Sequence, residues 1–348
     1  MASEQGILSQ LDASADRGVR PERARAALAE VPALPESLAA LERQLSQATA
    51  DAEERLQAAA RHLVSAGGKR IRPTITLLAC GACGGEMTRA VPFAVAAELT
   101  HSATLLHDDV IDDGPVRRGQ PASRVIWGNA VSVLSGDWLL TRALEIVSGE
   151  AARPAALPAL LRTMRRLVEG EVLQLTLRGG FSATERAYLD VVIGKTASLF
   201  GWCAAAGAWA AGVDGRVPEA LCRFGEGVGI AFQLVDDALD YGADPALLGK
   251  RLGQDLLEGK ATLPLIRAVE AEPSLRERLS LLVDGKADGD AVAAEVIAVV
   301  QRVGGVEAAR AMAREHTRDA LAALGEVPDG QHRAALQEAA VALTERAF

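Results

Sequence analysis

Aromatic residues are scarce in this chain of 348 residues, where they account for only 3%. Alanine and leucine dominate instead, and both are among the best helix formers. No segment shows the alternation of apolar and polar residues that is typical of a strand, and no fixed period repeats along the chain. A hydrophobic share of 49% and a charged share of 24% are typical of a globular protein. The sequence therefore predicts an all-α fold.

Basic charge is also in short supply. Lysine and arginine number 37 against 46 aspartates and glutamates, which gives a formal net charge of −9. A nucleic-acid binder needs a basic face to meet phosphate, and anionic lipid attracts basic segments. Neither function is favoured by this charge, and we expect no nucleic-acid partner.

Long hydrophobic runs are missing as well. The longest near-apolar run, residues 201–213, is shorter than the roughly 20 residues that a membrane span requires. No basic segment followed by an apolar one marks a signal peptide. The pair Cys80 and Cys83 has no second pair or histidine cluster nearby, so we expect buried, reduced thiols. These observations predict a cytoplasmic protein without a transmembrane segment.

Helical patterns begin at about residue 36 and continue to the C-terminus with short breaks. Residues 1–35 form a variable lead-in, and we expect residues 36–348 to form one large catalytic domain. Two expected helices, over residues 88–113 and 217–241, are apolar over much of their circumference, which places them in the middle of a bundle.

A third expected helix has a recognisable start. Ser182 and Glu185 have the spacing of a capping box, in which each side chain satisfies a backbone N–H group at the N-terminus of a helix. The pattern predicts that this helix runs on through Lys195 to Ala211.

Four aspartates crowd the segment "LLHDDVIDDGPVRRG", residues 105–119. Residues four apart lie on one face of a helix, so Asp108 and Asp112 are expected to form one column and Asp109 and Asp113 a second. Like charges this close repel each other, and the repulsion grows when the groups are buried. The segment is therefore expected to hold a cation.

A second cluster, Asp236, Asp237 and Asp240 in "FQLVDDALD", repeats the D-D-x-x-D spacing. Two matching clusters inside apolar helices disfavour a merely solvated acidic face. Carboxylate oxygens suit Mg²⁺, whose coordination is usually completed by water and substrate phosphate. The two clusters predict Mg²⁺ that bridges a phosphorylated substrate between two facing helices.

Basic residues that suit phosphate accompany both clusters, since arginine grips phosphate with two donors and lysine acts as a point charge. They are Lys69, Arg70, Arg72, Arg117, Arg118, Lys195, Lys250 and Lys260. So many cations suggest more than one diphosphate. The "GKT" at residues 194–196 is not a P-loop, because position 189 is leucine and no strand precedes it.

Six segments, in their order along the chain, resemble those of the trans-isoprenyl diphosphate synthases, the polyprenyl synthetase family. They are "GGKRIRP", "ELTHSATLLHDDVIDDGPVRRG", "GEVLQL", "GKTASLF", "FQLVDDALD" and "GKRLGQDLLEGKATLP". The resemblance implies the isoprenoid synthase fold, a single-domain helical bundle around a central cavity, usually in a homodimer. It also implies Mg²⁺-dependent, head-to-tail condensation of isopentenyl diphosphate onto an allylic diphosphate, with two or three Mg²⁺ ions and pyrophosphate as a product.

The resemblance also implies roles for individual residues. The metal ligands would be Asp108, Asp112, Asp236 and Asp240, supported by Asp237, Glu171 and Gln174. The contacts of the allylic diphosphate would be Arg117, Lys195, Thr196, Gln233, Lys250 and Lys260. The contacts of isopentenyl diphosphate would be Lys69, Arg72, His101 and Arg118. The residues implied to be catalytic are Asp108, Asp112, Arg117, Lys195, Asp236 and Lys250.

Product length is suggested by the residues one turn before the first motif. In this family, bulky aromatics at the positions of Ala103 and Thr104 stop chain growth at short products, and both residues here are small. The resemblance is greatest to long-chain synthases that make quinone side chains. It implies a long-chain, all-trans product of octaprenyl type, grown from farnesyl or geranyl diphosphate. Trp138 is a candidate floor of the product tunnel.

Three alternatives share part of this sequence pattern. The nearest is a geranylgeranyl or farnesyl diphosphate synthase, which shares all the motifs. A terpene cyclase usually carries a different second motif and lacks "GGKRIRP". A non-catalytic partner subunit is expected to have lost aspartates or arginines, and this chain has lost none.

Overall fold

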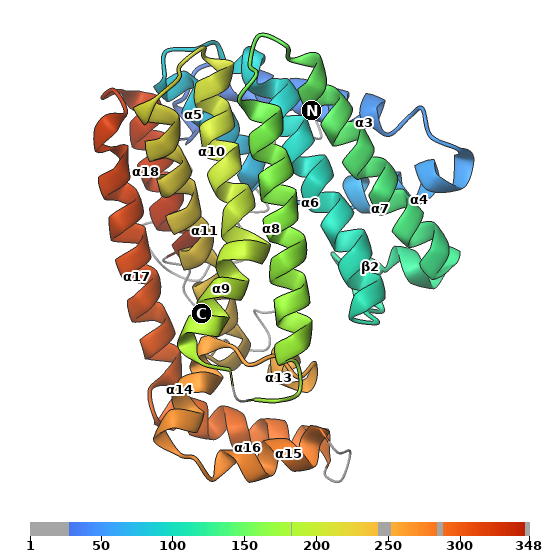
Figure 1. Cartoon of the computed structure of the whole chain (residues 1–348), viewed down its shortest axis with the longest axis vertical. Helices are drawn as coiled ribbons and strands as arrows, with labels where there is room; N and C mark the ends of the chain where they lie inside the picture. The colour runs from blue at the N-terminus through green and yellow to red at the C-terminus, as the bar shows by residue number, and fades with distance from the viewer. Residues whose placement is uncertain (1–27, 182, 243–251, 284–287, 345–348) are drawn as a thin grey trace.

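The chain forms a bundle of long helices with a layer of shorter helices at one end (Figure 1). The computed structural model describes residues 28–181, 183–242, 252–283 and 288–344. In this part the α-helices are α3 (Leu34–Ala48), α4 (Glu54–Ser65), α5 (Ile71–Ala82), α6 (Val91–Ile111), α7 (Ser123–Gly149), α8 (Ala156–Leu177), α9 (Glu185–Val192), α10 (Ser198–Ala210), α11 (Arg216–Gly242), α13 (Gln254–Leu257), α14 (Leu263–Ala271), α15 (Leu275–Val283), α16 (Gly289–Arg302), α17 (Gly305–Ala323) and α18 (Gln331–Thr344).

Short irregular elements connect these helices. They are the 3₁₀ turns η2 (Met87–Ala90) and η4 (Leu324–Glu326), the π-helical turn η3 (Ile193–Ala197), and the strands β1 (Val116–Arg117) and β2 (Gln120–Pro121). The strands pair antiparallel as a two-residue ribbon, and no other strand occurs in the described residues. The predicted all-α fold is confirmed.

The two helices expected in the middle of the bundle lie there. The helix expected over residues 88–113 is α6, preceded by η2, and the one expected over 217–241 is α11. Pro92 stands in the first turn of α6, where its missing N–H costs no hydrogen bond. Helix α6 packs most extensively against α7, while α11 lies against α10 and α17.

Two apolar clusters form the core. The first includes Phe93 on α6 and Phe224 on α11, and the second includes Tyr241 on α11 and Leu263 on α14. Helices α11 and α17 contribute buried side chains to both clusters. The two clusters are therefore connected through these helices. The division into a lead-in and one domain from about residue 36 stays a prediction, and residues 1–27 lie outside the described part.

The continuous helical stretch Glu185–Ala210 is long and apolar enough to cross a membrane, but 83% of its apolar window is buried inside the protein. It is therefore a core helix of the bundle. The capping-box prediction for its start is wrong, because α9 begins at Glu185 with Thr184 as its N-cap, whose hydroxyl accepts from the N–H of Ala187 at 3.2 Å. Ser182 lies outside the described residues.

The cysteines are free thiols, as expected. Cys80 is fully buried and Cys83 is half-buried. Burial raises the pKa of Cys80 to about 12 and that of Cys83 to about 11. Both thiols are therefore protonated and act as small hydrophobic residues of the core.

Candidate active site

A cavity of about 800 Å³ opens between α6, α8 and α11. The start of α5 and the turn η3 complete its walls. Its polar lining contains most of the residues predicted from the sequence: Lys69, Arg72, His101, Thr104, Asp108, Arg117, Arg118, Glu171, Lys195, Thr196, Gln233 and Asp236. Its apolar lining is Ile71, Leu105, Ile111, Leu167, Val168, Val172, Leu175 and Phe232. One cavity therefore combines a charged side with an apolar side, as a substrate with a diphosphate head and a hydrocarbon tail requires.

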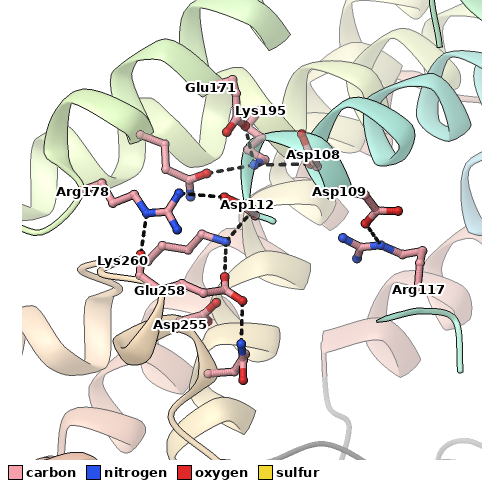
Figure 2. A network of polar contacts seen from close by, with 12 residues as sticks. Asp108, Asp109, Asp112, Arg117, Glu171, Arg178, Lys195, Asp255, Glu258 and Lys260 are labelled. Atoms are coloured by element: carbon pink, nitrogen blue, oxygen red, sulfur yellow. Dashed lines mark hydrogen bonds and ion pairs between the residues drawn. The ribbon is translucent and has the colours of Figure 1, made fainter. Parts of the chain in front are cut away.

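The first aspartate motif lies where α6 ends. Asp113 has a left-handed backbone with φ of 54°, and the N–H of Gly114 donates to the carbonyl of Asp109 at 3.0 Å. This is a Schellman ending, which terminates a helix abruptly. Asp112 is consequently the C-cap of the helix. Figure 2 shows Asp108 beside Lys195, and Asp112 beside Arg178 and Lys260.

The other two aspartates of the motif have different surroundings. Asp109 is 1% exposed, and its carboxylate accepts from the guanidinium of Arg117 at 2.7 Å. Asp113 is exposed and pairs with Arg124. The predicted second column of Asp109 and Asp113 is therefore wrong, because the helix ends before Asp113. Asp109 instead orients Arg117, which lines the cavity.

Lys195 enters the cavity from the π-helical turn η3. Its ammonium group pairs with Glu171, donates to the amide oxygen of Gln174 at 2.8 Å, and lies 3.5 Å from Asp108. Glu171 and Gln174 thus support the site through Lys195. A π turn inside a helix redirects the side chains that it carries and is frequent at functional sites.

The turn η3 approaches α8 through two glycines. A Cβ atom at Gly170 would lie 2.6 Å from the backbone nitrogen of Lys195, and one at Gly194 would lie 2.8 Å from the carbonyl oxygen of Arg166. Both distances are shorter than any real Cβ contact. The close packing that places Lys195 beside Glu171 therefore depends on the absence of side chains at both positions.

The second aspartate motif, on α11, divides its tasks. Asp236 lines the cavity opposite Asp108. Asp237 is buried, and its carboxylate accepts from the hydroxyl of Tyr188 and the amide of Gln233, each at 2.7 Å. Burial raises the pKa of Asp237 to about 7. Asp237 therefore positions Gln233, whose amide oxygen accepts from Thr196 at 3.0 Å.

Asp240 anchors a segment of the chain that we call the strap, residues 253–262. The carbonyl of Asp240 accepts from the N–H of Gly253 at 2.8 Å, and its carboxylate accepts from the N–H of Asp255 at 3.0 Å. Asp240 is fully buried and lines neither of the two larger cavities. Asp240 thus supports the strap, and its role as a metal ligand stays a prediction.

The strap carries Lys260 to the first aspartate motif. Its ammonium group lies 3.2 Å from Asp112 and 2.6 Å from Glu258 (Figure 2). Burial alone would lower the pKa of Lys260, but the hydrogen bond to Glu258 and the charge of Asp112 raise it. Lys260 therefore stays protonated. Lys250, predicted to bind the same diphosphate, lies outside the described residues.

Sequence reasoning missed Arg178, which shares Asp112 with Lys260. Its guanidinium donates to Asp112 at 3.1 Å and to the backbone carbonyl of Glu258 at 2.7 Å. Arg178 stands outside the motif segments, so only its charge at the end of an expected helix could have drawn attention to it.

The four residues predicted to contact isopentenyl diphosphate gather at the other polar wall of the cavity. The Arg72 guanidinium stacks over the ring of Phe200, 4.5 Å from its centroid. Burial, together with the charges of Arg72 and Arg118, holds the pKa of His101 well below its usual value. His101 is therefore neutral at pH 7, able both to donate and to accept hydrogen bonds.

A buried carboxylate balances this basic wall. Glu98 is 2% exposed, accepts from Arg70 at 2.5 Å, and lies 3.7 Å from Arg118. Arg70 also pairs with Glu42 on α3. Burial would lower the pKa of Arg70, but these two carboxylates raise it. Arg70 is therefore a structural ion-pair residue, a role that its motif position alone did not indicate.

The carboxylates fit the expected Mg²⁺. Asp108 and Asp236 line the cavity and offer hard oxygen donors there. Asp112 lines none of the three described cavities and pairs with Lys260, whereas Asp108 lies beside Lys195. Among the described residues, no group of three or more acidic, histidine or cysteine side chains lies close enough together to hold a metal ion by itself. Mg²⁺ does not require such a group, because water and substrate phosphate supply its remaining ligands.

The residues expected to set product length are only partly at the cavity. Thr104 lines it, one turn below Asp108. Ala103 is fully buried in the core, and Trp138 packs against that same core without lining any of the described cavities. Trp138 is only partly buried, and its role as the floor of the product tunnel stays a prediction.

Comparison with known proteins decides the family. Residues 53–300 match the family model described as polyprenyl synthetase. The chain belongs to the polyprenyl synthetase family. Its activity is accordingly that of a trans-polyprenyl diphosphate synthase.

Individual relatives of this synthase differ in their products. The chain is 39% identical to the octaprenyl diphosphate synthase of Escherichia coli over 276 residues, which cover 79% of this chain and 85% of the relative. It is 37% identical to a short chain isoprenyl diphosphate synthase of Methanothermobacter thermautotrophicus over 297 residues, 84% of this chain and 91% of the relative. The family therefore fixes the chemistry but not the product length.

The fold agrees with a solved structure of the family. The crystal structure of a polyprenyl synthase from Caulobacter crescentus, complexed with calcium and isoprenyl diphosphate, matches with a TM-score of 0.83 and 38% identity. The match covers 90% of this chain and 96% of that one.

Proposed function

We propose that this synthase uses Mg²⁺ to add isopentenyl diphosphate units, head to tail, to farnesyl or geranyl diphosphate. The product is a long-chain, all-trans polyprenyl diphosphate of octaprenyl type, suited to quinone side chains. The observation that carries the proposal is the cavity itself, in which an acidic end, a separate basic wall and an open apolar side meet. The free thiols support a cytoplasmic enzyme, since such thiols persist where the environment is reducing.

The allylic diphosphate belongs at the acidic end. Asp108, Asp112 and Asp236 would hold Mg²⁺ there, which supplies Lewis-acid stabilisation to the departing pyrophosphate when bound. Lys195 adds a positive charge that Glu171 and Gln174 keep in place. Contacts of this group also include Arg117, Thr196, Gln233 and Lys260, and we extend the site to Lys250.

Isopentenyl diphosphate belongs at the basic wall formed by Lys69, Arg72, His101 and Arg118. Arg72 and Arg118 are half-buried there, and this burial lowers the pKa of each. Half-buried guanidinium groups with little competing water bind a diphosphate strongly and in a fixed orientation. Two diphosphate sites on different walls keep the two substrates apart until their hydrocarbon ends meet.

The reaction then needs few protein groups. The allylic C–O bond breaks, and the departing pyrophosphate takes the electron pair. The double bond of isopentenyl diphosphate attacks the allylic carbon, and a proton is lost from the new cationic intermediate to the pyrophosphate. Lys195 and Arg117 stabilise the developing negative charge, while Leu105 and Phe232 form part of the apolar wall that excludes water.

A long product is favoured by the openness of the apolar wall. Thr104 is a small lining residue one turn before Asp108, and Phe232 on α11 is the one Phe, Tyr or Trp among the described residues that line the cavity. Val168 and Val172, on the same wall, are 64% and 56% exposed. The growing chain therefore meets no barrier on the side of α8.

We also infer a homodimer, which would cover this open side. Large hydrophobic side chains exposed on α7 and α8 form what we call the α7–α8 face: Val125, Ile126, Val133, Leu134, Leu161, Val168, Val172 and Leu175. Soluble monomers rarely expose so many large apolar residues on adjacent helices. A second copy is the occupant that fits, because the face is apolar and continuous with the cavity wall.

The dimer is tested by light scattering after gel filtration. The substitution Leu134→Glu is expected to yield a monomer, while Leu281→Glu, which places the same charge on α15, leaves the dimer intact. A monomeric wild-type protein would refute the inference.

Product length is the direct test of function. Purified protein is incubated with farnesyl diphosphate, excess isopentenyl diphosphate and Mg²⁺, and the products are sized by mass spectrometry. Products of seven to ten prenyl units are expected. Termination at four units would identify a geranylgeranyl synthase with a deeper barrier, and no elongation would identify a subunit that needs a partner.

A further inference from the structure

Arg178 lies at the end of α8, where a cation is often present only to stabilise the helix terminus. The side chain of Arg178 instead contacts other parts of the chain. Its guanidinium donates to two other segments of the chain, Asp112 at the end of α6 and the carbonyl of Glu258 in the strap. Arg178 therefore connects three parts of the active site.

The strap is fixed to the bundle at three places. Asp240 on α11 holds its first residues through two hydrogen bonds to backbone N–H groups. Arg178 and the N–H of Gly179 hold its second half, by bonds of 2.7 Å to the carbonyl of Glu258 and 2.8 Å to that of Gly259. Lys260 completes the connection at Asp112.

At the second of these places, the backbone of Gly259 in the strap lies very close to that of Gly179 after α8. Gly259 has φ of 77°, and a Cβ atom there would lie 3.1 Å from the backbone nitrogen of Gly179. A side chain at Gly259 is therefore disfavoured both by backbone conformation and by space. Arg178 lies directly beside this contact and adds a charge-assisted hydrogen bond to it, which is stronger than a neutral one.

Arg178 also faces the substrate region. It lines a smaller cavity of about 140 Å³ together with Lys195 and Lys260. Thr196, Gln233 and Lys195 line both this cavity and the larger one. Figure 2 shows the guanidinium between Asp112 of the first aspartate motif and Glu258 of the strap.

We propose that Arg178 is a positioning residue of the allylic diphosphate site. It fixes the strap against α8 and thereby holds Lys260 beside Asp112, at the place where the diphosphate binds. The inference rests on the proposed function, because it takes the end of the cavity near Asp112 as that binding place. Without Arg178, Asp240 and Gly179 still hold the strap, but Lys260 loses its fixed register with Asp112.

Two variants and a control test this role. Arg178→Gln removes the charge, and Arg178→Lys keeps the charge but loses the fork that bonds Glu258 and Asp112 together. Arg186→Gln is the matched control, because Arg186 is an exposed arginine on α9 that pairs with Asp190 of its own helix. Each variant is assayed for binding of inorganic pyrophosphate in the presence of Mg²⁺ by calorimetry.

For Arg178→Gln, we expect pyrophosphate binding to weaken about tenfold and the backbone amides of residues 253–260 to exchange hydrogen several-fold faster. Arg178→Lys is expected to recover only part of the affinity. The KM for the allylic diphosphate should rise, while the KM for isopentenyl diphosphate stays within twofold, since Arg72 and His101 are untouched.

Two results would overturn the proposal. One is a variant indistinguishable from Arg186→Gln in both affinity and exchange. The other is faster exchange with unchanged pyrophosphate affinity, which would make Arg178 a purely structural tie. A wild-type protein that binds pyrophosphate with Mg²⁺ but fails to elongate would refute the proposed product and leave the role of Arg178 standing.

Discussion

Replacing Glu98 tests whether the basic wall depends on a buried counter-charge. The substitution Glu98→Gln keeps the size of the side chain and removes its negative charge. Arg70 then keeps Glu42 and the carbonyl of Val64, whereas Arg118 keeps only the carbonyl of Leu63.

The expected loss follows from burial. Side chains of Glu98 and Arg70 are only 3% and 4% exposed, so water cannot replace the lost charge. Breaking a buried ion pair by removing one partner costs about 3–5 kcal/mol. Because Glu42 remains and is 34% exposed, we expect the lower end, about 3 kcal/mol.

Urea unfolding followed by circular dichroism measures this loss, with Glu86→Gln as control. Glu86 and Arg89 form an exposed pair at 3.7 Å, and such pairs contribute under about 1 kcal/mol. Inorganic pyrophosphate without Mg²⁺ should restore more stability to the Glu98→Gln variant than to the wild type, since it binds the uncompensated guanidinium groups. A loss equal to that of the control would refute the reasoning.

Three further predictions concern the walls of the cavity. Gly170→Ala should destabilise the protein by about 1–3 kcal/mol and lower kcat, because the added methyl group displaces the π turn. Gly149→Ala is the control, since Gly149 has open space around it and neither stability nor kcat should change. Urea unfolding measures the stability and steady-state kinetics measure kcat. The pKa of His101 is lowered in the folded protein, so between pH 6.5 and 5.5 the unfolded chain takes up a proton that the folded chain does not. The free energy of unfolding therefore falls as the pH decreases. In urea titrations, His101→Gln should reduce that fall by roughly 1 kcal/mol. Thr104→Phe should shorten the products seen by mass spectrometry, and Trp138→Ala should leave their length unchanged, since only Thr104 lines the cavity.

Much of the fold was predictable from local patterns. Helices α6 and α11 follow from continuous apolar character with breaks at Gly114 and Gly242, and both were expected within a few residues of their bounds. Local sequence patterns did not predict the helix ends that depend on backbone geometry. The Schellman turn at Asp113 removed that residue from the helix, and the choice of Thr184 over Ser182 as N-cap was equally invisible in the spacing.

The candidate site was predictable as a set of residues but not as an arrangement. Asp108, Asp236 and Lys195 were expected together, and they line one cavity. The roles of Asp237 and Asp240 could not be predicted, because Asp237 bonds Tyr188 and Asp240 bonds the strap. Both partners are brought to α11 by the tertiary fold.

The sequence alone determined the helical class, the two aspartate clusters and the basic residues, because charge, helical period and spacing are properties of neighbours along the chain. The tertiary structure decided which of those charges face the cavity, which are buried against partners, and that Arg178 and Glu98 belong to the site at all. The physical reason is that a buried charge is stable only beside a partner. For Glu98 that partner is 28 residues away along the chain, and for Arg178 it is 66.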